Sequence, residues 1–163
     1  PIEEDVEKYK EDTSFKLSYL TKFKTLCTLS VRIPQIESDG NCYFRALSDQ
    51  ISGSEEGHRI LRILILDFIS DNRELFEPFI DHEYFSSWND FVFKMRQDGT
   101  FADGTIIVAS ATLLRREIII HQNEQRPVLF KASFSMSNSN QIHLLYDSKN
   151  LHYNSLWQAD GNK

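Results

Sequence analysis

The sequence predicts a single α/β (α+β) domain in which helices flank one small central sheet. The chain has 163 residues, which is the size of one ordinary domain. Hydrophobic residues make up 40% and aromatic residues 12% of the chain, enough to form a packed core. Helical periodicity dominates up to about residue 114, and β-branched runs dominate after it.

Composition and charge exclude several classes of protein. The net charge of -6, from 18 Lys+Arg against 24 Asp+Glu, argues against a nucleic-acid binder, which normally has a basic surplus. No run approaches the ~18 apolar residues of a membrane span, and no signal peptide is recognisable. Two cysteines, Cys27 and Cys42, are too few for a disulfide-stapled fold or a four-cysteine zinc site. Because the chain begins with Pro1 rather than Met, we expect a fragment.

The first third of the chain leads to a turn. Residues 1–12 are acidic and predict a solvated first helix, and residues 15–29 continue a helical spacing. A short extended segment follows at residues 31–33, before Pro34. The small polar residues Ser38–Asn41 then predict a turn that leads directly into Cys42.

Five helical segments are expected after this turn. The first begins at Cys42 and ends near Gly53, and the second covers residues 55–70. The apolar stripe of the second is typical of a buried helix and consists of Ile60, Leu61, Leu64, Ile65, Phe68 and Ile69. A shorter helix is predicted over residues 72–80 and another over residues 84–95. Asp103 caps the last one, which runs to about Leu114.

Four extended segments follow the helices. The β-branched run at residues 117–121 predicts a buried strand, and further strands are expected at residues 128–130 and 142–146. The polar segment 133–140 separates the last two and is either a solvated loop or a mobile contact element for substrate. A final extended segment is expected at residues 151–153.

Cys42 is the candidate nucleophile. A helix start lowers the pKa of a cysteine, because unpaired amides and the helix dipole favour the thiolate. The amides of Gly40, Asn41 and Cys42 are also candidates for an oxyanion hole, and glycine permits the close backbone approach. The alternative is a small buried residue at a helix start, which is the commoner fate of a free cysteine. Cys27, next to Leu26, is most simply a core residue.

A cysteine nucleophile needs an imidazole to take its proton. His58 and His82 lie in polar surroundings and are expected to be exposed, and His121 and His143 belong to strands. His152 differs because Asn154, two residues later in an extended segment, projects to the same side and can orient the ring.

The segment Ser38–Ser48 resembles the nucleophile motif of the ovarian tumour (OTU) family of cysteine proteases, and His152–Leu156 resembles the histidine motif of that family. The resemblance implies a papain-like fold over residues 33–157. Residues 1–32, which the resemblance does not cover, are expected to form a helical extension, and residues 158–163 a tail. It also implies a thiol-dependent deubiquitinase that cleaves isopeptide bonds after the C-terminal glycine of ubiquitin, or of a ubiquitin-like modifier. The alternative is a non-catalytic ubiquitin-binding or scaffolding module with the same fold.

The resemblance assigns roles residue by residue. Cys42 is the nucleophile, His152 the general base and Asn154 the orienting residue. Asp39 matches an acidic position that is often described as catalytic, and we expect it to organise the oxyanion turn formed by Gly40 and Asn41.

Substrate contacts are expected near the later helix and around the histidine. Phe101 and Gly104 lie where many OTU proteases have an aromatic residue and two glycines, and the sequence departs from that pattern. Tyr153 and Trp157 are candidate channel walls or core aromatics. We expect ubiquitin or polyubiquitin as partner, no nucleic acid, no cofactor and no metal. A cytoplasmic location is expected, or the host cytosol for a pathogen effector.

Overall fold

A computed structural model describes residues 31–32, 36–122, 125–131 and 141–158. The helices predicted at 1–12 and 15–29, Cys27 and the polar segment 133–140 lie outside these ranges.

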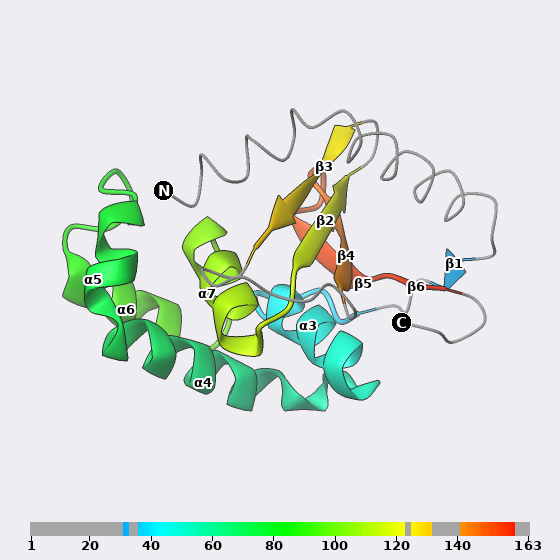
Figure 1. Cartoon of the computed structure of the whole chain (residues 1–163), viewed down its shortest axis with the longest axis horizontal. Helices are drawn as coiled ribbons and strands as arrows, with labels where there is room; N and C mark the ends of the chain where they lie inside the picture. The colour runs from blue at the N-terminus through cyan, green and yellow to red at the C-terminus, as the bar shows by residue number, and fades with distance from the viewer. Residues whose placement is uncertain (1–30, 33–35, 123–124, 132–140, 159–163) are drawn as a thin grey trace.

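A four-stranded sheet forms one layer of the molecule, with the strand order β3-β2-β4-β5 (Figure 1). Its strands are β2 (Ile118–Gln122), β3 (Gln125–Phe130), β4 (Ile142–Asp147) and β5 (His152–Ser155). The central pair β2 and β4 is parallel, and the two outer pairs are antiparallel. The strand that contains His152 therefore lies at one edge of the sheet.

Helices cover this sheet in two tiers. The helices α3 (Cys42–Ser52) and α7 (Gly104–Leu114) lie between the sheet and the longer helix α4 (His58–Asp71) (Figure 1). Helix α3 contacts β4 and β5 directly. The start of α3 is thereby held beside the edge strand β5.

The remaining helices lie at the end of the molecule that is far from β6 (Figure 1). They are α5 (Arg73–Phe76), the 3-10 turn η2 (Glu77–Phe79) and α6 (Trp88–Arg96), while the 3-10 turn η1 (Glu55–Gly57) precedes α4. The prediction that the fourth helix starts at residue 84 is wrong. The Ser87 hydroxyl accepts the Asp90 amide at 3.1 Å and the Asp90 carboxylate accepts the Ser86 amide at 3.0 Å, so α6 begins at Trp88.

The core lies between the sheet and the helices. Its fully buried side chains come from α3, α4, α7 and the facing side of the sheet, and include Phe44, Leu47, Ile65, Leu66, Ile106, Ile118, Ile142 and Leu144. Asp103 caps α7 as the sequence predicts, because its carboxylate accepts the Ile106 amide at 3.1 Å.

The buried face of α4 differs from the predicted stripe. Ile60 and Leu64 are 65% and 50% exposed, whereas His58 and Arg62 are 5% and 3% exposed. Two polar side chains therefore occupy the buried face of α4 in its first two turns, next to the start of α3. Apolar side chains take over this face from Ile65 onward.

A short ribbon joins the two ends of the described chain. Strand β1 (Val31–Arg32) pairs antiparallel with β6 (Trp157–Gln158), a strand that the sequence analysis does not predict. Within the described ranges, no helix is long and apolar enough to cross a membrane.

Candidate active site

Cys42 is the first residue of α3 and follows directly on the turn at residues 38–41. Its backbone N–H donates to the Asp39 carbonyl at 3.1 Å, which closes the turn. Asn41 is the N-cap residue of α3, but its side chain does not cap the helix. The Asn41 side chain therefore does not occupy the amides at the start of α3, but the Cys42 N–H must leave the Asp39 carbonyl before it can bind an oxyanion.

The Cys42 thiol is buried, and Cys42 is only 1% exposed. Burial raises the pKa of the thiol, and the nearby Asp39 charge acts in the same direction. Hydrogen bonds to the backbone of Tyr153 and Tyr43 oppose this shift but do not overcome it. The backbone at the helix start lowers the thiol pKa as expected, but desolvation penalises the thiolate more strongly, so the net pKa is raised in the free protein.

His152 and Asn154 lie on the same side of β5, as the two-residue period of a strand predicts. The His152 Nε2 atom lies 3.0 Å from the Asn154 Oδ1 atom. The same oxygen accepts the Ile36 backbone N–H at 3.4 Å. Because a backbone N–H requires an acceptor, this contact identifies the atom facing His152 as the amide oxygen.

This contact sets the tautomer of His152. An amide oxygen only accepts hydrogen bonds, so Nε2 must carry the proton that it shares with Asn154. The other ring nitrogen, Nδ1, is then the basic one in the neutral ring. The Tyr153 backbone lies close enough to the Cys42 sulfur to lower the thiol pKa, which places the sulfur beside the residue that follows His152.

Gln50 joins the helix of Cys42 to the strands around His152. Its Nε2 donates to the Ser155 hydroxyl at 2.7 Å and to the Leu156 carbonyl at 3.0 Å. Its Oε1 accepts the His143 backbone N–H at 3.2 Å. One buried amide thus fixes α3 against both β4 and the end of β5.

Asp39 is held by the turn and by Arg45. Its carboxylate accepts the Asn41 backbone N–H at 3.0 Å and is bonded by the Arg45 Nη2 at 2.9 Å and Nε at 3.1 Å. Arg45 also pairs with Glu55 at 3.1 Å. Burial alone would raise the pKa of Asp39, but the hydrogen bonds from Arg45 and Asn41 outweigh it and hold the pKa below its usual value. Asp39 therefore has the contacts of a residue that organises the turn, whereas Asn154 contacts the imidazole.

Gly40 lies against the turn that precedes α7. A Cβ atom at residue 40 would be 1.6 Å from the Gly99 carbonyl oxygen. No other residue type fits between these two backbones without moving one of them. The sequence predicts that another group closely approaches the Gly40 backbone, and in the structure that group is the Gly99 carbonyl.

The four predicted substrate contacts differ in their exposure. Phe101 is 53% exposed, and Gly104 has open space where a side chain would be. Tyr153 packs edge-on against Tyr43 with 5.3 Å between ring centroids. These three remain candidate substrate contacts.

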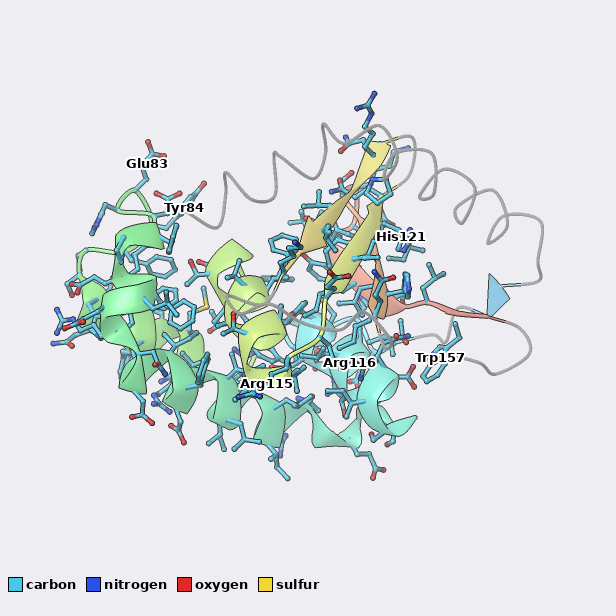
Figure 2. All side chains as sticks on the ribbon, in the orientation of Figure 1. Glu83, Tyr84, Arg115, Arg116, His121 and Trp157 are labelled. Atoms are coloured by element: carbon cyan, nitrogen blue, oxygen red, sulfur yellow. The ribbon has the colours of Figure 1, made fainter. Side chains whose placement is uncertain are left out.

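Trp157 is a core aromatic rather than an open channel wall. It is the first residue of β6, is 6% exposed and lies beside α3 (Figure 2). Its indole Nε1 donates to the Asp49 carboxylate at 2.6 Å. This bond anchors the C-terminal ribbon on the nucleophile helix.

His58 is buried, contrary to the sequence expectation. Its Nδ1 has no hydrogen-bond partner among the described residues. Burial lowers the pKa of the imidazole, the positive charge of Arg45 lowers it further, and the Asp39 charge opposes both. The ring is therefore held neutral behind the Asp39–Arg45 pair.

Three residues of this site have no assigned role in the sequence analysis: Arg45, Gln50 and Arg62. Gln50 and Arg62 are polar residues at buried positions of predicted helices, and Arg45 is a partly buried one. Their partners lie far away along the chain or on other elements, so local spacing does not identify them. In the ranges that the structure describes, no group of three or more His, Cys, Asp or Glu side chains is placed to hold a metal ion.

The chain is similar in sequence to known proteases. A family model described as OTU-like cysteine protease matches residues 37–155. The chain is 37% identical over 138 residues to OVARIAN TUMOR DOMAIN-containing deubiquitinating enzyme 7 of Arabidopsis thaliana. It is 30% identical over 137 residues to OTU domain-containing protein 3 of Mus musculus. Both alignments cover 84% of this chain but only 36% and 34% of the relatives, so the chain spans about a third of their length.

Solved structures share the fold. The OTU domain of OTUD1 superposes with a TM-score of 0.72 at 25% identity, covering 87% of this chain and 96% of that domain. A structure of an ovarian tumour (OTU) domain in complex with ubiquitin superposes with a TM-score of 0.65 at 17% identity, covering 80% and 71% of the two chains. The predicted fold, a small sheet flanked by helices, is confirmed.

Proposed function

The chain belongs to the family of OTU-like cysteine proteases, and from this we propose that it is a deubiquitinase that hydrolyses the isopeptide bond after the C-terminal glycine of ubiquitin. One observation supports the proposal above all. The His152–Asn154 pair, 3.0 Å apart, lies on a strand that packs against α3, the helix that begins at Cys42. A nucleophile, a base and a group that orients the base are the requirements of thiol-dependent acyl transfer.

Ubiquitin is the proposed substrate because of the relatives. Two of the similar structures, the Hazara virus OTU and a further OTU domain, are bound to ubiquitin. The Arabidopsis thaliana relative is named as a deubiquitinating enzyme. The net charge of -6 is consistent with a basic partner but does not identify one.

The proposed reaction begins with attack on the glycine carbonyl. His152 Nδ1 takes the Cys42 proton as the sulfur bonds to the carbonyl carbon, and the carbonyl electron pair moves to the oxygen. The Gly40 amide donates to this oxyanion, and the Cys42 amide joins it by exchanging its 3.1 Å bond to the Asp39 carbonyl for a bond to the oxyanion. Because burial raises the thiol pKa, the proton leaves during the attack and no stable thiolate is needed beforehand.

The intermediate then collapses. The C–N bond breaks, and the leaving lysine amine takes the proton from His152, which leaves a thioester on Cys42. Water attacks the thioester carbonyl and gives its proton to His152. The C–S bond breaks, the sulfur is reprotonated, and the ubiquitin carboxylate is released. The net reaction consumes one water molecule and requires no oxidant or metal.

The test uses a ubiquitin probe with an electrophilic C-terminus, in parallel with equivalent ubiquitin-like probes. We expect covalent labelling at Cys42 by the ubiquitin probe, and no labelling of Cys42→Ala. We also expect His152→Ala to abolish the cleavage of ubiquitin chains while leaving the fold intact by circular dichroism. Absence of labelling with every modifier, together with retained ubiquitin binding, would contradict the proposal and favour the non-catalytic module.

A further inference from the structure

Arg62 is a buried cation beside the proposed oxyanion turn. It is 3% exposed and lies one helical turn after His58 on the inner face of α4. Its guanidinium lies over the Phe44 ring, with 4.1 Å to the centroid. A guanidinium removed from water is costly unless its N–H groups are bonded. The buried N–H groups of Arg62 therefore need hydrogen-bond acceptors.

The Arg62 side chain donates to three uncharged acceptors on two other segments. Its Nη1 donates to the Met95 carbonyl at 2.8 Å, and its Nη2 donates to the Thr100 carbonyl at 2.9 Å. The same Nη2 donates to the Asn41 Oδ1 at 2.8 Å. The planar fork thus joins the end of α6 and the turn that follows it to the residue before Cys42.

Asn41 is held by this contact and by two others. Its Oδ1 also accepts the Gly99 backbone N–H at 2.8 Å, and its Nδ2 donates to the Asp39 carboxylate at 3.2 Å. Both ends of the amide are therefore bonded. The Asn41 side chain cannot rotate without losing the bonds that connect the two turns.

The two turns are in direct backbone contact. A Cβ atom at residue 40 would lie 1.6 Å from the Gly99 carbonyl oxygen, so the Gly40 and Gly99 backbones touch. Arg62 bonds to Asn41 and Thr100, the residues that follow these two glycines. The guanidinium is placed to fasten one turn onto the other.

We propose that Arg62 is a positioning residue that fixes the oxyanion turn through Asn41; this rests on the proposed hydrolase function. Arg62 touches neither the thiol nor the imidazole in the described contacts, and it acts by holding the backbone of the Gly40–Cys42 turn in one orientation. A hydrophobic residue could fill its volume and even preserve stability. Such a residue could not donate a hydrogen bond to the Asn41 oxygen. The role of Arg62 is therefore to position Asn41 rather than to fill the core.

The charge of Arg62 is not the feature that matters in this proposal. Lysine has a cation but no planar fork, and it cannot reach three acceptors in the same directions. We therefore expect Arg62→Lys to behave like Arg62→Met. A role for the charge alone would let Arg62→Lys retain full activity, which would overturn the proposal.

The kinetic test measures kcat and KM on a fluorogenic C-terminal amide of ubiquitin. We expect Arg62→Met and Arg62→Lys to lower kcat roughly 10- to 100-fold, as misplaced catalytic groups do, with KM within about twofold. Arg59→Met is the matched control, because Arg59 is on the same helix but is 75% exposed and lies 3.9 Å from Asp98. Its kcat should stay within about twofold of the wild type. An unchanged kcat for both Arg62 variants would overturn the proposal.

A double-mutant cycle tests the route through Asn41. If Arg62 acts by holding Asn41, then kcat of the double variant falls no further than that of Asn41→Ala alone, which also loses the Gly99 and Asp39 contacts. Multiplied losses would show independent roles and would overturn the proposal. Asn41→Ala also serves as the test variant if Arg62→Met fails to fold, because it removes the same contact without changing α4.

Backbone amide exchange tests the inference without ubiquitin. The Gly99 N–H is bonded to Asn41, so Arg62→Met should raise its exchange rate about tenfold or more while the amides of β2 keep theirs. If no ubiquitin probe labels the protein but Gly99 exchanges faster in Arg62→Met, the proposed hydrolase function fails while the Arg62–Asn41 contact is still shown to hold the two turns together. If Gly99 in a folded Arg62→Met variant exchanges at the wild-type rate, Arg62 does not fix the turn through Asn41 and the proposal is overturned.

Discussion

The Gln50 side-chain amide donates to the Ser155 hydroxyl at 2.7 Å, and this bond connects the nucleophile helix to the histidine strand. Gln50 lies about two turns after Cys42 on α3, and Ser155 lies three residues after His152 on β5. Both side chains are buried, at 3% and 0% exposure. The distance between the Cys42 thiol and the His152 imidazole therefore depends on the Gln50–Ser155 bond, which involves neither of these two residues.

Replacing Gln50 with methionine should damage both stability and turnover. The substitution keeps the volume but leaves the Ser155 hydroxyl, the Leu156 carbonyl and the His143 amide without their partner. We expect a loss of roughly 1–3 kcal/mol in the free energy of unfolding, measured by urea titration, and a lower kcat. Gln97→Met on the exposed end of α6 should change stability by less than about 0.5 kcal/mol. Equal stability of the two variants would contradict the assignment.

Asn154 should matter for turnover through the oxygen that it presents to His152. Asn154→Ala removes the acceptor at 3.0 Å, and we expect kcat to fall roughly 10- to 100-fold. Asn154→Asp keeps an oxygen for both His152 and the Ile36 amide and should retain activity within a few fold. Asn150→Ala, in the exposed turn before β5, should leave kcat unchanged. The comparison is made on the ubiquitin amide substrate, and an active Asn154→Ala would exclude an orienting role.

The local sequence predicts the parts of this site that depend on neighbours along the chain. The turn before Cys42, the helix after it and the Asp103 cap follow from short spacing rules, as does the shared side of His152 and Asn154. The start of α6 is mispredicted because Tyr84 and Phe85 continue the apolar period in front of its true cap.

Contacts between distant segments could not be predicted from the same rules. Asp49 and Trp157 meet across 108 positions, and Gln50 and Ser155 across 105. Arg62 lies on the inner face of α4 because the Asn41 side chain and the Met95 and Thr100 carbonyls present hydrogen-bond acceptors there, none of which adjoins α4 in the sequence. The direction of the Cys42 pKa shift also depends on burial, which only the assembled fold produces.

Asp39 should make stability depend on acid pH. Its folded pKa lies below the ordinary value of 3.8, so the unfolded chain binds the proton more readily. The stabilisation is present above about pH 4 and is lost as the pH falls through the folded pKa. We expect the free energy of unfolding of the wild type to fall more steeply below pH 4 than that of Asp39→Asn. Parallel curves for the two proteins would refute the ion pair with Arg45 as the cause.

The Cys42 thiol should ionise late in the free protein. Burial raises its pKa, so the rate of alkylation by iodoacetamide should rise with pH to a midpoint above the ~8.5 of an ordinary cysteine. The measurement is made in a Cys27→Ser variant, so that Cys42 is the only thiol available for alkylation. A midpoint near pH 6 would mean that a thiolate is formed in advance, and the reaction would then start from an ion pair with His152.

His58 should make the protein less stable in mild acid. Its folded pKa lies below 6.5 because the ring is buried and faces Arg45, with Arg59 adding to this effect and Asp39 and Asp98 opposing it. The unfolded chain therefore takes up the proton first, and the free energy of unfolding falls as the pH drops below about 6.5.

Substitution by glutamine should remove this dependence. His58→Gln has no proton to gain, so its free energy of unfolding should change less between pH 7 and pH 5 than that of the wild type, measured by urea titration at each pH. His82→Gln is the matched control, since His82 is exposed, and it should follow the wild-type slope. If His58→Gln also follows that slope, another buried group must take up the proton. Burial of the His58 ring, aided by the charge of Arg45, would then not be the source of the pH dependence.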